Sequence, residues 1–161
     1  MKTTTLALAL SLLPIAAQAQ TNPILDDMIF ASVVCAQGFG DLAAMDAALV
    51  GAGWTKGEVV DGAIEYQAPE GSEETYALID AEKGQSCNIW SASLGIDDAK
   101  AVTLAVFDEL KVNVADAKLV TDAYGCEGLE LPSGVGVSAV SSDDPPVCEG
   151  GSGSQLIFSN Y

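Results

Sequence analysis

Histidine and arginine are both absent from this chain of 161 residues. A serine or cysteine nucleophile usually relies on a neighbouring histidine as its base, so the commonest nucleophilic hydrolases are disfavoured. The serine–lysine alternative often places a serine three residues before the lysine, and no lysine of this chain has one there. Zinc also lacks its usual nitrogen ligand. These absences argue against the common catalytic and metal-dependent classes, and we expect no cofactor and no metal.

Positive charge is scarce as well. Six lysines face 23 acidic residues, and the formal net charge is −17. Such a chain repels nucleic-acid phosphates and anionic headgroups and attracts cations over roughly a Debye length, about 10 Å at 0.1 M salt. We therefore expect no nucleic-acid partner and favour a cationic protein or peptide. A purely solubilising role for the acidic residues is the alternative.

Long apolar runs are missing too, because no segment after residue 19 approaches the roughly 18 apolar residues of a membrane span. The first residues combine Lys2, the short run LALALSLLPIAA and the small-residue ending Ala17-Gln18-Ala19. This arrangement is typical of a cleaved signal peptide. We predict a signal peptide over 1–19 and a periplasmic or secreted mature chain, 20–161, that forms one domain and does not insert into the membrane.

The cysteines predict disulfides. Cys35, Cys87, Cys126 and Cys148 are an even number in an exported chain, and no pair has CxxC spacing. Two structural disulfides are the favoured interpretation. A helix packed on one face of a sheet can present Cys35 to Cys87, while Cys126 and Cys148 flank an expected strand, 135–141. Of the three pairings we therefore predict Cys35–Cys87 and Cys126–Cys148.

Apolar residues recur at helical spacing in three segments. Asn22-Pro23 is a favourable start for a helix that runs to about residue 36, and Asp41 can cap a second, short one with Gly51 just past its end. A third helix is expected to begin near Asp97-Asp98, with Asp97 and Lys100 as a charge pair on its solvent-exposed side. We expect its apolar side to consist of Ala101, Leu104, Ala105, Phe107 and Leu110.

Elsewhere the apolar period is two, which indicates strands with one wet face. The expected strands are 60–67, 76–81, 86–92, 118–124, 135–141 and 155–159. The segment GVGVSA at 134–139 formally matches a GxGxxA dinucleotide fingerprint. We interpret it as a strand, because valines alternate in it and prolines follow rather than a helix.

The order helix, strand, strand, strand thus occurs twice, in candidate halves 22–93 and 94–161. Serine, isoleucine and serine occur at matching positions of GQSCNIWSA (84–92) and SGSQLIFSN (152–160). Phe158 occupies the position that matches Trp90. A tandem αβββ pseudo-repeat is one interpretation, and a chance match is the other. In either case we predict an α+β fold with helices packed on one face of an antiparallel sheet.

Acidic residues are too abundant for any pair to stand out as catalytic. The loop SSDDPPVCEGG at 141–151 holds Asp143, Asp144 and Glu149 around two prolines and lacks the EF-hand spacing for calcium. We take these three acids as candidate partner-binding residues. Trp90 is the fourth candidate, and alternation does not say which face of the sheet it occupies.

The favoured function is a non-catalytic exported binding protein whose acidic surface meets a cationic protein or peptide, in the manner of an inhibitor. Two alternatives stay open at this point: a carboxylate-dependent hydrolase acting on polysaccharide, and a structural component of the envelope. We assign no catalytic residue, and the sequence leaves the oligomeric state open.

Overall fold

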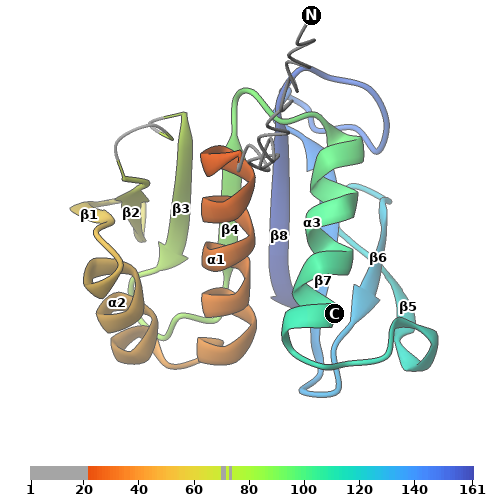
Figure 1. Cartoon of the computed structure of the whole chain (residues 1–161), viewed down its shortest axis with the longest axis horizontal. Coiled ribbons are helices and arrows are strands. Elements are labelled where there is room, and N and C mark those ends of the chain that lie inside the picture. The colour runs from red at the N-terminus through yellow and green to blue at the C-terminus, as the bar shows by residue number, and fades with distance from the viewer. Residues whose placement is uncertain (1–21, 70–71, 73) are drawn as a thin grey trace, which may run out of the picture.

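The computed structural model describes residues 22–69, 72 and 74–161 (Figure 1). The predicted signal peptide, 1–19, lies outside these residues, so its cleavage stays a prediction. Within the described part of the chain, no helix has both the length and the apolar character needed to cross a bilayer.

The described residues form helices packed on an eight-stranded antiparallel sheet, and the predicted α+β class is confirmed. The helices are α1 (Pro23–Gly38), α2 (Leu42–Gly51), α3 (Ile96–Glu109) and the single 3₁₀ turn η1 (Val114–Asp116). The strands are β1 (Thr55–Val60), β2 (Ala63–Gln67), β3 (Thr75–Asp80), β4 (Cys87–Ser91), β5 (Lys118–Thr121), β6 (Glu127–Glu130), β7 (Val135–Ser141) and β8 (Ser154–Asn160). Their order across the sheet is β1-β2-β3-β4-β8-β7-β6-β5.

Two of the helix starts follow from their capping residues. The Asn22 side chain accepts a hydrogen bond from the Ile24 amide at 3.2 Å, and the Asp41 side chain accepts one from the Ala44 amide at 3.0 Å. Each bond satisfies an amide that has no partner within its helix. The third helix begins at Ile96 without a side-chain cap, and Asp97 and Asp98 lie in its first turn, where carboxylates stabilise the helix dipole.

The helices lie on one face of the sheet, as predicted (Figure 1). α1 packs on β3 and β4, α3 packs on β7 and β8, and the two helices contact each other. α2 packs on α1 and reaches β1. The sheet centre, where β4 pairs with β8, is therefore covered by the two longer helices.

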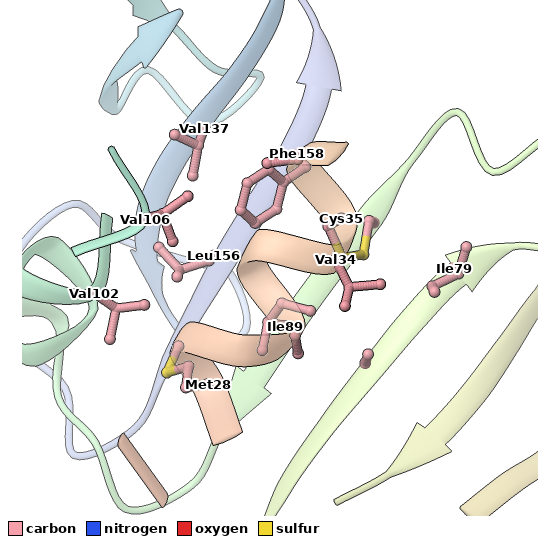
Figure 2. Packing of buried hydrophobic residues seen from close by; sticks show 14 of the residues in the cluster. Met28, Val34, Cys35, Ile79, Ile89, Val102, Val106, Val137, Leu156 and Phe158 are labelled. Carbon is pink, nitrogen blue, oxygen red and sulfur yellow. A yellow bond between two sulfur atoms is a disulfide. The ribbon is translucent and has the colours of Figure 1, made fainter. Parts of the chain in front are cut away.

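The core fills the space between these helices and the sheet (Figure 2). Cross-strand pairing aligns Ile79, Cys87, Phe158 and Val137 on four successive strands, β3, β4, β8 and β7, and all four are fully buried. The predicted disulfide Cys35–Cys87 joins α1 to this row, with 5.9 Å between the Cα atoms. The other predicted pairing, Cys126–Cys148, is present as well.

Each half contributes four strands, whereas the sequence predicted three. The prediction missed β1 and β6. All six residues of β1 are exposed, so no buried face produces an alternating pattern, and β6 has only four residues. The prediction of a strand rather than a dinucleotide-binding turn at 134–139 is confirmed, because Val135 to Ala139 belong to β7.

The residues that match between 84–92 and 152–160 are not structurally equivalent. Ile89 faces the helices and pairs with Leu156, whereas Ile157, its match in the sequence, lies on the other face. Trp90 likewise points away from the helices, while Phe158 is in the core. The order of elements therefore recurs, but the matching residues do not support a duplication. The duplication stays a prediction.

Candidate functional site

A groove with a volume of about 470 Å³ lies between α3 and strands β5, β6 and β7. Its floor is a cross-strand row of Leu119, Leu129 and Val137, and Leu104 of α3 contributes to its wall. Leu104 is 52% exposed and Leu119 is 73% exposed. Large aliphatic side chains gathered in an open concavity are typical of a binding site.

The α3 wall of the groove is apolar because α3 carries apolar residues outside the stripe that meets the sheet. The buried residues of α3 include Val102, Thr103, Val106 and Phe107. The predicted apolar side was wrong at Ala101 and Leu104, which are exposed. The helix turns its Val102–Val106 stripe onto β7 and β8, and no described element covers the flank that carries Leu104.

Charged side chains border the apolar floor. Glu127, at the start of β6, and Glu149, in the loop between β7 and β8, both line the groove and are exposed. Lys100 of α3 also lines it, and its Nζ atom lies 3.5 Å from the Cys148 carbonyl oxygen. It does not form the predicted ion pair with Asp97. The groove is thus an apolar surface with a mainly acidic rim.

The rim is fixed by a buried carboxylate and a disulfide. Asp122 accepts hydrogen bonds from the amides of Tyr124 and Cys126, at 2.9 and 2.8 Å, and from the Ser138 hydroxyl at 2.7 Å. These bonds order the turn that leads into Glu127. The Cys126–Cys148 disulfide then joins this turn to the loop that carries Glu149. The two rim carboxylates are therefore held by one covalently linked frame.

Of the four predicted partner-binding residues, only Glu149 lines the groove. Asp143 and Asp144 lie in the same loop and are exposed, but they are not part of the groove lining. Trp90 lies on the sheet face opposite the helices, so the structure separates it from Glu149. The four residues do not form one site.

Trp90 belongs to a second surface, the aromatic face of the sheet. Its ring stacks on Tyr76 of β3, with 5.8 Å between the centroids and 7° between the planes. Burial raises the pKa of the Tyr76 hydroxyl, and the negative charge of Glu65 adds to this shift. The Trp90 indole nitrogen is buried and has no hydrogen-bond partner among the described residues. Both rings are half-buried, so this face is less open than the groove.

A polar cluster, separate from the groove and from the aromatic face, joins α2 to the sheet. The Tyr66 hydroxyl donates a hydrogen bond to Asp46 at 2.7 Å, and the Lys56 ammonium lies 2.7 Å from the same carboxylate oxygen. The bond from Lys56, with that from Tyr66, holds the pKa of the Asp46 carboxyl below its ordinary value. Burial, with the neighbouring carboxylate, raises the pKa of Tyr66. Because Tyr66 is fully buried, we interpret this cluster as a structural contact rather than a catalytic one.

The described residues contain no group of three or more cysteine, aspartate or glutamate side chains placed to hold a metal ion. No protein-family model, curated protein or solved structure matches this chain. The groove must therefore be interpreted from its own chemistry.

Sequence reasoning missed the groove residues Leu104, Leu119, Lys100 and Glu127. One signal was available for Leu104: the apolar residues 101–107 are spread too widely around the helix to fit a single buried stripe. No local signal marks Leu119, because its exposure depends on the absence of a covering element.

Proposed function

We propose that the chain is a non-catalytic exported binding protein whose groove beside α3 receives a basic segment of a partner protein. One observation carries the proposal: an apolar groove with two exposed leucines is bordered by Glu127 and Glu149 in a chain of net charge −17. The partner segment would place aliphatic side chains on the floor and lysine or arginine side chains at the rim.

The energetics assign separate roles to the apolar and charged groups. Full burial of a leucine side chain contributes roughly 1.5–3 kcal/mol, so covering Leu104 and Leu119 offsets part of the association cost of about 4 kcal/mol or more. The exposed rim carboxylates add little affinity in water, but they orient the partner and accelerate its approach. We therefore expect the leucines to govern dissociation and the acids to govern association.

Export belongs to the same proposal. Two disulfides fit an oxidising compartment, and the predicted signal peptide would deliver the chain to the periplasm or the medium. Occupation of the groove by a functional segment of the partner would block that segment, so an inhibitory role is consistent with the proposal.

The experiment uses a photo-reactive amino acid at Leu104 in the exporting cells. Val50, on the outer face of α2, is the matched control because it is 48% exposed, close to the value for Leu104. We expect a crosslink from position 104, and not from position 50, to a segment rich in lysine or arginine. Equal crosslinking at the two positions, or a crosslinked segment without basic residues, would contradict the proposal.

The crosslinked partner is then purified and its association rate measured. We expect Glu127→Gln with Glu149→Gln to slow association several-fold at low salt and to have little effect at about 1 M salt, where the Debye length is about 3 Å. Glu58→Gln with Glu82→Gln removes the same charge from exposed positions far from the groove and serves as the control. Equal slowing by both double variants would show that only the overall charge matters.

A further inference from the structure

The helix-facing side of the sheet is covered differently at its two ends (Figure 1). At the β1 end, α2 packs beside α1 and reaches β1. At the β5 end, the segment between α3 and β5 forms only the single turn η1. The groove lies beside α3 and over β5 and β6, which is the place that corresponds to α2 at the other end.

The correspondence extends to side chains. α2 buries Met45 and Leu49, one helical turn apart, and its Asp46 binds the cross-strand pair Lys56 and Tyr66 of β1 and β2. The corresponding helix-facing pair of β5 and β6 is Leu119 and Leu129. A helix placed over this pair would therefore meet leucines instead of a lysine and a tyrosine.

We infer that the groove receives a short amphipathic helix of the partner, seated beside α3 as α2 is seated beside α1. The inference rests on the proposed function and names the form of the bound segment. Aliphatic residues one turn apart would face Leu104, Leu119 and Leu129, and basic residues on the flanks would face Glu127 and Glu149.

A second copy of this chain is a poor occupant. Its own α2 has no basic residue, and Asp46 would approach the acidic rim. Two chains of net charge −17 would also repel each other. Charge complementarity therefore favours a basic helix from a different protein.

The test uses two synthetic peptides of about 14 residues, because shorter isolated helices are marginal in water. Both carry two leucines one turn apart, lysines on the two flanking faces, alanines at the remaining positions, and capped ends. In the second peptide a central residue is replaced by proline, which a helix interior does not tolerate. Binding to the mature, disulfide-bonded protein is measured by titration calorimetry, and helix formation by circular dichroism.

We expect the helical peptide to bind at least about tenfold more tightly than the proline peptide and to gain helicity on binding. Leu104→Lys should weaken this binding at least about tenfold, whereas Val50→Lys on the outer face of α2 should leave it unchanged. Both positions are exposed, so both variants should fold.

The other outcomes separate the two proposals. If both peptides bind equally and Leu104→Lys weakens both, the segment docks in an extended form; the inference is then wrong and the proposed function stands. If neither peptide binds, the inference is also wrong, and crosslinking at position 104 decides the proposed function independently. Equal weakening by Leu104→Lys and Val50→Lys would show that the peptides respond only to net charge and would overturn the inference.

Discussion

The two ends of the sheet have similar strands and different covers. At the β1 end the chain supplies its own helix, and Met45 and Leu49 become core residues. At the β5 end no described helix follows α3 in that place, and Leu104 and Leu119 remain exposed beside a groove. The comparison shows that the same kind of aliphatic side chain is buried in the core at one end of the sheet and exposed to solvent at the other.

The two disulfides differ in the same sense. Cys35–Cys87 is fully buried and joins α1 to the central strand β4. Cys126–Cys148 joins the turn before β6 to the loop that carries Glu149. The first disulfide connects elements of the core, and the second frames the groove.

The largest expected effect is on the free energy of unfolding when either disulfide is removed. Partner binding should then distinguish the two disulfides. In the chain-entropy account, Cys35→Ala with Cys87→Ala should lower the free energy of unfolding by about 4 kcal/mol, and Cys126→Ala with Cys148→Ala by about 3 kcal/mol, because the sequence separations are 52 and 22 residues. Urea denaturation measures both values. Only the second variant should also lose partner binding at temperatures where both are folded, and equal loss of binding would contradict the distinction.

The next contrast concerns the aliphatic residues of the two ends. Leu49→Ala should destabilise the protein by roughly 2–5 kcal/mol, because it removes a fully buried side chain and leaves a cavity. Leu104→Ala should change the free energy of unfolding by less than about 0.5 kcal/mol, because this side chain is already half exposed. Thermal and urea unfolding of the two variants test this. A large effect of Leu104→Ala would mean that the groove wall belongs to the core.

A smaller effect than that of Leu49→Ala is expected at the polar contact of α2. Because the pKa of Asp46 is lowered in the folded state, its contribution to stability is present above the ordinary value of 3.8 and is lost as the pH falls through the folded-state pKa. Asp46→Asn should therefore reduce stability at neutral pH by less than about 1 kcal/mol and should match the parent protein near pH 2. Glu58→Gln, an exposed position on β1, is the control and should change stability little at either pH. A constant deficit of the Asp46→Asn variant across this range would rule out an ionised Asp46 as the cause.

Local sequence patterns predict much of this fold. Asn22 and Asp41 predicted two helix starts because capping depends on residues within one turn. The alternation in β3 and β4 predicted strands because one face of each is buried. The pairing of Cys35 with Cys87 followed from the expected position of a helix over the sheet.

The candidate site was less predictable, because a surface depends on what does not pack against it. Leu104 has the pattern of a core residue and is exposed since the flank of α3 on which it lies is uncovered. Trp90 and Glu149 were grouped by residue type, but the sheet separates them. Edge strand β1 gave no signal because it buries neither face.

The most direct test of the groove as a binding surface is a titration of the ¹⁵N-labelled, disulfide-bonded chain 20–161 with the helical leucine–lysine peptide, followed by amide chemical shifts. We predict that the perturbed amides cluster on α3, β5 and β6 and on the loop that carries Glu149, and that the amides of α2 and β1 keep their chemical shifts. Perturbations spread over all exposed acidic residues, or centred on Tyr76 and Trp90 of the aromatic face, would contradict it.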